Sequence, residues 1–236
     1  MADVLSKTFR VRGLDLENRS AMEDFVAGSV ADLATLERAF EGVDALVITH
    51  MVPNKPGNYD TPELPFDVNV KGTALLLHMA VKKGIKRVVL VSSAGVVGTA
   101  FKNGEYLTRD LPSSVTNMYG LTKLMQETLA HYYHQQHGLE VAILRPAYIC
   151  CGDSLKDKYG VQRPSVNWQF IDPRDIGKAA SCALTVDELG YEVFYLMAGP
   201  GVHERADVGY TETRLGWQPD FRFEEFPRDE EVAKKV

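Results

Sequence analysis

Val88-Val-Leu-Val-Ser-Ser-Ala94 and Tyr119-Gly-Leu-Thr-Lys123 are the two stretches that decide the fold. The first is a short β-branched run, typical of a buried strand, that ends in two serines. A helix is predicted from about Asn117 to His137, because Gly138 stops it. A second apolar run follows as Glu140-Val-Ala-Ile-Leu-Arg-Pro146. The tyrosine and lysine therefore open a helix that lies between two strands.

The spacing of these polar residues indicates acid/base chemistry. Positions four apart share one face of a helix, so the Tyr119 phenol and the Lys123 ammonium are predicted to point into one cleft. The ammonium favours the phenolate and should lower the pKa of Tyr119 from about 10 toward a useful range. If Ser93 hydrogen-bonds the same substrate oxygen, the three residues form a site that oxidises an alcohol or reduces a carbonyl. Such chemistry needs a hydride carrier, and no side chain can be one.

These stretches resemble the extended branch of the short-chain dehydrogenase/reductase family, which includes NAD-dependent epimerases and dehydratases and 3β-hydroxysteroid dehydrogenases. Three further stretches carry the resemblance. Gly42-Val-Asp-Ala-Leu-Val-Ile48 is similar to the family's fourth strand, and Phe170-Ile-Asp-Pro-Arg-Asp-Ile176 to its late motif. Arg214-Leu-Gly-Trp-Gln-Pro219 is similar to its C-terminal signature. The resemblance implies an α/β protein with a Rossmann-like, doubly wound parallel sheet.

One domain is expected. With 236 residues and 45% hydrophobic content, the chain can bury a substantial core without splitting. We interpret residues 1–236 as a single NAD(P)-binding domain of the epimerase/dehydratase type, with about 150–170 and 199–236 forming a minimal substrate-side region.

In this family the first strand leads into a Gly-x-x-Gly-x-x-Gly turn, which brings backbone amides to the cofactor pyrophosphate. None of the 19 glycines of the sequence forms that pattern, and no stretch corresponds to the strand before it. Ala2–Lys7 is interpreted as the end of the helix that normally follows this turn, and Phe9–Leu14 as the family's second strand. Either the chain is a truncated form of an ordinary enzyme, or it is a natural short form with a damaged cofactor site. The sheet is therefore expected to lack its first strand.

The resemblance places the adenosine half of the cofactor near Asp15. A carboxylate there accepts hydrogen bonds from the ribose hydroxyls and repels a 2′-phosphate, which favours NAD over NADP. Alternatively Asp15 begins a polar loop, and Arg12 or Arg19 reaches a phosphate. Ser29 replaces the family's usual aspartate at the adenine contact, and Val30 is its hydrophobic neighbour.

Three polar residues further along have alternative roles. Thr49 and His50 stand where the family has small residues beside the cofactor; His50 is either a proton relay or a structural residue at a strand end. Asn69 either orders the active-site loops, as its family counterpart does, or caps a turn. Asp32 is predicted to be the N-cap of a helix rather than a ligand.

The resemblance also implies the roles of the reacting groups. Tyr119 exchanges a proton with the substrate, Lys123 lowers its pKa and holds the nicotinamide ribose, and Ser93 orients the reacting oxygen. Ser92 is the less suited serine, because Ser93, which directly precedes Ala94, is the one that matches the family's catalytic position. The remaining expected contacts of the nicotinamide half are Val91, Pro146, Ala147, Tyr148 and Ile149.

Two irregular segments border the predicted cleft. Val52–Pro65 contains four prolines and is expected to be a loop over the site. Gly152–Asn167 is short for the family's substrate-binding insertion, which favours a sugar acid, an aldose or another small alcohol over a nucleotide-sugar. In it, Arg163, Lys156 or Lys158 either meets a substrate carboxylate or faces solvent.

Composition excludes several classes of function. The formal charge of −6 and the absence of a basic stripe exclude the usual electrostatic basis of nucleic-acid binding. The apolar runs are strand-sized, so no membrane role is expected. Three cysteines form no disulfide framework, which favours the cytoplasm, and the histidines lack metal-ligand spacing, so no metal is expected.

The expected function is that of an NAD(P)-dependent oxidoreductase or epimerase/dehydratase in carbohydrate metabolism. The alternatives are a non-catalytic dinucleotide- or protein-binding member of the fold, and an inactive truncated fragment. A homodimer is possible, because relatives pair through the helix of Tyr119. The apolar series that serves either the core or such a partner is Leu121, Leu124, Met125, Leu129 and Tyr132.

Overall fold

The computed structural model describes residues 1–53 and 55–229. Its central sheet is parallel and four-stranded, in the order β3-β4-β5-β8. The four strands are β3 (Ala45–Ile48), β4 (Arg87–Val91), β5 (Glu140–Pro146) and β8 (Tyr191–Leu196). β4 and β5 are buried along almost their whole length, which is why their sequences are apolar without alternation. The predicted α/β class and parallel sheet are confirmed.

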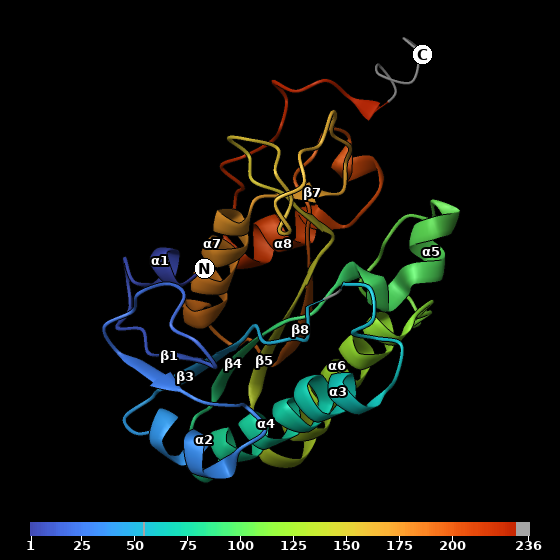
Figure 1. Cartoon of the computed structure of the whole chain (residues 1–236). Coiled ribbons are helices and arrows are strands. Elements are labelled where there is room, and N and C mark those ends of the chain that lie inside the picture. The colour runs from blue at the N-terminus through green and yellow to red at the C-terminus, as the bar shows by residue number, and fades with distance from the viewer. Residues whose placement is uncertain (54, 230–236) are drawn as a thin grey trace.

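Helices cover both faces of this sheet (Figure 1). On one face pack α2 (Leu33–Ala39), α4 (Gly72–Lys82) and α6 (Met118–His137). On the other pack α1 (Ala2–Leu5), α7 (Pro173–Thr185) and α8 (Val208–Leu215). The connecting helical segments are α3 (Glu63–Pro65), η1 (Phe66–Lys71), η2 (Ala94–Val97), α5 (Gly98–Asn103) and η3 (Val202–Glu204). The resulting three layers are those of a doubly wound fold.

A separate pair of short parallel strands, β1 (Gly13–Asp15) and β2 (Phe25–Ala27), stands beside the main sheet without hydrogen-bonding to it. The predicted strand over Phe9–Leu14 is therefore wrong in its first half. Phe9 and Val11 pack their side chains against the core under α7 instead. A strand forms only where a neighbouring backbone pairs with it, and β2 pairs with β1 from Gly13 onward.

Local signals fix the ends of two helices as predicted. α6 begins after Asn117, whose side chain accepts a hydrogen bond from the Gly120 amide at 2.7 Å, and it ends at Gly138 in the left-handed conformation. α2 begins after Asp32, whose carboxylate accepts hydrogen bonds from the amides of Ala34 and Thr35. The assignment of Asp32 as an N-cap is confirmed.

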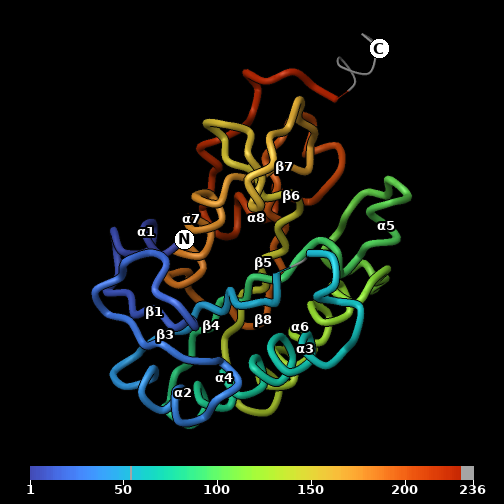
Figure 2. Tube along the Cα trace, in the orientation of Figure 1, coloured from blue at the N-terminus to red at the C-terminus, as the bar shows by residue number. Residues whose placement is uncertain are grey.

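The irregular segment after β5 lies against the C-terminal part of the described chain (Figure 2). It contains β6 (Tyr148–Ile149) and leads to β7 (Phe170–Ile171), which pairs with it. Val166 pairs with Arg228, and the Phe170 carbonyl accepts a hydrogen bond from the Ala198 amide at 2.7 Å. These contacts join the two segments proposed to form the substrate side; residues 230–236 lie outside the described residues.

Gly199 is where these segments approach most closely. A Cβ atom at this position would lie 1.9 Å from the carbonyl oxygen of Asn167, a backbone atom that cannot rotate away. Gly199→Ala is therefore expected to lower the free energy of unfolding by about 2 kcal/mol, measured by urea denaturation. Gly209→Ala in α8 is the control, since nothing lies within 4 Å of its added Cβ. Equal stability of the two variants would contradict the prediction.

Candidate functional site

The carboxyl ends of β4 and β5 and the first turn of α6 meet at one edge of the sheet. Ser93 follows β4 and accepts a hydrogen bond from the Gly95 amide at 3.1 Å, which fixes its hydroxyl at the start of η2. Tyr119 lies in the first turn of α6, close enough to Ser93 for that side chain to lower the pKa of its phenol. The structure thus brings together the serine and the tyrosine that the sequence selected.

The Tyr119 phenol is held in its protonated form. Burial raises its pKa to about 12, and the Ser93 side chain lowers it only in part. The ring of Tyr59 packs edge-on against it, with 5.7 Å between ring centroids. The expected lowering of the Tyr119 pKa by Lys123 is not found: burial raises this pKa, and Lys123 is not among the groups that shift it.

Lys123 is buried with 2% of its surface exposed. Its ammonium donates a hydrogen bond to the Val91 carbonyl at 2.9 Å, at the end of β4. Burial lowers the pKa of Lys123 to about 7; the neighbouring Lys158 lowers it further, and Glu127 acts in the opposite direction. The ammonium therefore lies at the carboxyl end of β4, where it is bound to the backbone.

This burial makes stability depend on pH. Folded Lys123 titrates near pH 7, whereas an unfolded lysine titrates near about 10.4. Below pH 7 Lys123 is charged in both states, and its burial lowers the free energy of unfolding by the full amount. This loss of stability becomes smaller as pH rises and disappears near about pH 10.4, above which the lysine is neutral in both states. Lys123→Met should therefore raise the melting temperature more below pH 7 than near pH 10.4. The exposed control Lys86→Met should show no such difference, and a pH-independent effect of Lys123→Met would refute the assignment.

Asn69 organises the loop in front of the site. It lies in η1, a π-helical turn, and is fully buried. Its carbonyl oxygen accepts a hydrogen bond from the Val52 amide at 2.8 Å, and its amide group donates to Thr122 at 3.0 Å and Tyr59 at 3.2 Å. Asn69 therefore ties the Tyr59 loop to α6, which matches the loop-ordering alternative.

A buried charged network lies under the site, and the sequence did not reveal it. Arg145 on β5 donates two hydrogen bonds to Glu127 of α6, at 3.0 and 2.7 Å. Ser92 donates a third to Glu127 at 2.5 Å, so its hydroxyl is engaged below the sheet end. The Ser92 hydroxyl is thus bonded to Glu127, whereas Ser93 lines the cavity described below. The spacing of four between Lys123 and Glu127 was the available signal, since it places both on one helix face.

The predicted cofactor residues lie at the ends of β1, β2 and β3. Asp15 is exposed, and its carboxylate accepts a hydrogen bond from the Leu16 amide at 2.7 Å. The Ser29 hydroxyl accepts one from the Ala31 amide at 3.1 Å. Val30 and His50 both pack against Gly72, where a Cβ would lie 2.6 and 3.2 Å from them. Thr49 is exposed at the end of β3.

His50 has one ring nitrogen that lacks a partner. Its Nε2 lies 3.0 Å from the Val68 carbonyl, whereas its Nδ1 is buried and makes no hydrogen bond. Burial and the neighbouring Lys123 lower its pKa to about 4, so the ring is neutral and Nδ1 is an acceptor when Nε2 donates to Val68. An acceptor without a partner beside a buried ammonium fits a ligand that carries hydroxyl groups.

A cavity of about 220 Å³ opens beside Ser93. Ala147 and Tyr148 form one of its walls, and the other lining residues include Phe101, Thr116 and Gln169. The backbone that was expected to face a nicotinamide carboxamide is partly engaged, since the Tyr148 amide donates to Gln169 and the Ile149 carbonyl accepts from Lys158. A larger surface hollow of about 390 Å³, lined by residues such as Arg109, Tyr191 and Glu192, shares none of the site residues.

These observations test the fit of a dinucleotide. The cavity beside Ser93 has room for a ligand group at the expected nicotinamide end, whereas Lys123 and the His50 Nδ1 are buried and do not line it. For the pyrophosphate, the sequence offers no glycine-rich turn. The fit is therefore to the reacting half of the cofactor.

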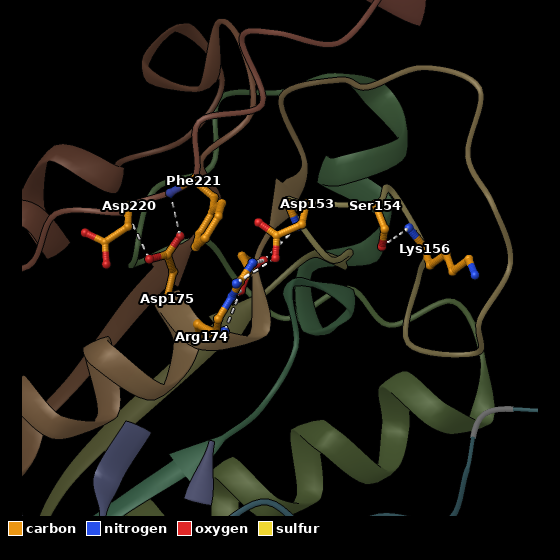
Figure 3. Close-up of polar contacts among 9 residues, drawn as sticks. Asp153, Ser154, Lys156, Arg174, Asp175, Asp220 and Phe221 are labelled. Carbon is orange, nitrogen blue, oxygen red and sulfur yellow. Dashed lines mark hydrogen bonds and ion pairs between the residues drawn. The ribbon is translucent and has the colours of Figure 1, made fainter. Parts of the chain in front are cut away.

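The substrate-side loop is anchored to the start of α7 by charged side chains (Figure 3). Arg174 donates hydrogen bonds to Asp153 at 2.8 Å and to Asp172, and its guanidinium stacks over the Phe221 ring. The Asp172 carboxylate also accepts a hydrogen bond from the Gly152 amide at 2.7 Å. The irregular loop is therefore fixed at its base.

Two other classes of site are not seen in the part of the chain that the structure describes. No group of three histidine, cysteine or acidic side chains is arranged to hold a metal ion in residues 1–53 and 55–229. Within the same ranges, no helix has the length and apolar character needed to cross a bilayer.

Solved structures share the fold. One is a short-chain dehydrogenase/reductase superfamily protein from Agrobacterium tumefaciens with bound NAD; it superposes with a TM-score of 0.77 and 21% identity, over 99% of this chain and 92% of that one. Together with the strand order, this likeness confirms the predicted Rossmann-like fold.

The sequence itself matches the model of the NAD dependent epimerase/dehydratase family over residues 2–152. The chain belongs to this family, as its motifs predicted. It is 30% identical over 146 residues to the L-arabinose 1-dehydrogenase (NAD(P)(+)) of Haloferax volcanii, covering 57% of this chain and 56% of that protein. It is 27% identical over 177 residues to the uronate dehydrogenase of Pseudomonas syringae pv. tomato, covering 73% and 58%. The chain thus spans a little over half the length of these curated relatives.

Proposed function

We propose that the chain is an NAD(P)-dependent oxidoreductase that acts on a sugar, a sugar acid or another small alcohol or carbonyl compound. The observation that supports the proposal is that Tyr119, Lys123 and Ser93 gather at the carboxyl end of β4, where Ser93 lines a cavity. Sheet ends of this kind are where α/β proteins bind their ligands.

The chain's own groups would manage the proton. Tyr119 is protonated at neutral pH, so it can donate to a carbonyl oxygen that Ser93 orients. Oxidation of an alcohol requires the reverse transfer, which Lys123 would assist if its ammonium turned from the Val91 carbonyl toward the phenol. A bound nicotinamide would supply or accept the hydride.

NAD is the proposed cofactor, with NADP less favoured. Asp15 presents an exposed carboxylate at the end of β1, where it would repel a 2′-phosphate. The Agrobacterium structure contains NAD, and the Haloferax relative is named for NAD(P)(+). These relatives favour a net redox reaction, although an epimerase or dehydratase would use the same first step.

Two properties of the whole molecule are also proposed. In the apolar series of α6, Leu129 packs against the core, whereas the other members are half-buried or exposed. The inward face of the helix is formed by polar residues such as Lys123 and Glu127, which supports pairing of two copies through the remaining apolar residues. The three cysteines are free thiols, which suits a cytoplasmic protein.

The experiment is an assay of the purified chain with NAD and NADP against aldoses and uronic acids, followed by the absorbance of the reduced cofactor. Turnover that requires NAD supports the proposal. Dinucleotide binding without turnover of any sugar would contradict it and would favour the non-catalytic alternative.

A further inference from the structure

Lys158 places a second positive charge at the candidate site. Its ammonium lies 5.9 Å from the ring centroid of Tyr119 and 5.2 Å from that of Tyr159. Although the residue is exposed overall, partial burial of its ammonium lowers its pKa. The cation therefore lies near the ring of Tyr119 while the residue keeps access to solvent.

The nearest carboxylates are engaged elsewhere. Asp157 accepts hydrogen bonds from the Tyr148 hydroxyl at 2.9 Å and from Arg163 at 2.8 Å, and its other oxygen accepts two backbone amides. Glu127 is paired with Arg145. Among residues 1–53 and 55–229, no ion pair joins Lys158 to a carboxylate.

Two ammonium groups act on the same small region. Lys158 is the second largest cause of the lowered pKa of Lys123, which shows that the two cations repel each other across the site. An anion bound between them and Tyr119 would relieve that repulsion. The site therefore favours a ligand with a negative charge.

The backbone of Lys158 is held in place. Its amide donates to the Ile149 carbonyl at 3.3 Å, next to the cavity wall, and the base of its loop is anchored through Asp153 and Arg174. Lys156, two residues earlier, is exposed and its side chain extends away from this anchor (Figure 3). The two lysines share one loop but differ in their access to Tyr119.

We propose that Lys158 recognises an anionic group, a carboxylate or a phosphate, on the substrate whose reacting oxygen meets Tyr119. The inference rests on the proposed function and narrows its substrate class to acidic sugars. Lys158 is thus a specificity-determining residue.

The test compares D-galacturonate and D-glucose 6-phosphate with neutral D-galactose, in the parent chain and in Lys158→Met. The parent should favour an acid, and the comparison of the two acids identifies the anionic group. Lys158→Met should raise KM for that acid at least roughly tenfold, with a much smaller change in kcat, and the rise in KM should be much larger than any rise for galactose. Lys158→Arg should restore the preference, and the control Lys156→Met should match the parent.

A binding measurement separates this proposal from the proposed function. Calorimetric titration of the chain with each acid, without cofactor, should show binding that Lys158→Met abolishes and Lys156→Met retains. If no sugar is turned over but this binding is found, the redox function fails and the role of Lys158 stands. The proposal is overturned if sugars are turned over and Lys158→Met shows the same preference between acidic and neutral sugars as the parent chain. It is also overturned if neither acid binds, or if the variant loses NAD binding instead.

Discussion

Tyr119→Phe is expected to reduce turnover roughly 100- to 10,000-fold, because the variant lacks the hydroxyl that we propose exchanges a proton with the substrate beside Ser93. The ring is kept, so its edge-on packing against Tyr59 and its position under Lys158 should persist. The loss should therefore appear in kcat, with little change in melting temperature or in the binding of the cofactor.

Tyr132→Phe is the matched control for this variant. Tyr132 lies on the same helix, and 54% of its surface is exposed on the outward side. It should retain full activity. If Tyr119→Phe keeps more than about a tenth of the parent rate, general acid catalysis by this phenol is excluded, because a smaller factor falls below the range such catalysis supplies.

Local sequence patterns were sufficient for much of the fold. The strand before Ser93 and the helix of Tyr119 were predictable because their signals lie within a few residues: a β-branched run, an Asn N-cap and a stopping glycine. The family resemblance supplied the order of the elements. The strand at Phe9 was overextended because strand length depends on a neighbouring backbone that a sequence does not show.

The side-chain environment of the site was less predictable. Tyr59 reaches Tyr119 from a proline-rich loop that Asn69 holds, and no local pattern fixes such a contact. The pKa of Tyr119 is raised chiefly by burial, which a sequence does not show, and the charge of Lys123 that the spacing suggested is not among its causes. Helical periodicity did not identify the inward face of α6 either. An apolar face is usually the buried one, whereas in α6 the buried face contains mostly polar residues.

That polar face contains the ion pair of Glu127 and Arg145, whose side chains are only 6% and 7% exposed. Arg145→Met is expected to lower the free energy of unfolding by about 3–5 kcal/mol, because it leaves a carboxylate buried with Ser92 as its remaining hydrogen-bond donor from this network. Urea denaturation monitored by circular dichroism measures the change. Arg222→Met, at an exposed arginine that bonds only Gln218 in the described chain, should unfold like the parent.

A double variant distinguishes loss of the pair from loss of packing. Glu127→Leu combined with Arg145→Met removes both charges and fills the space with apolar side chains, so it should recover most of the stability lost in Arg145→Met. If the double variant is less stable than Arg145→Met, the cost arises from the shape of the side chains and not from an uncompensated charge. Because Glu127 raises the pKa of Lys123, the double variant should also keep Lys123 neutral to lower pH than the parent does. The network under the sheet would then set both the stability of the fold and the charge at the site.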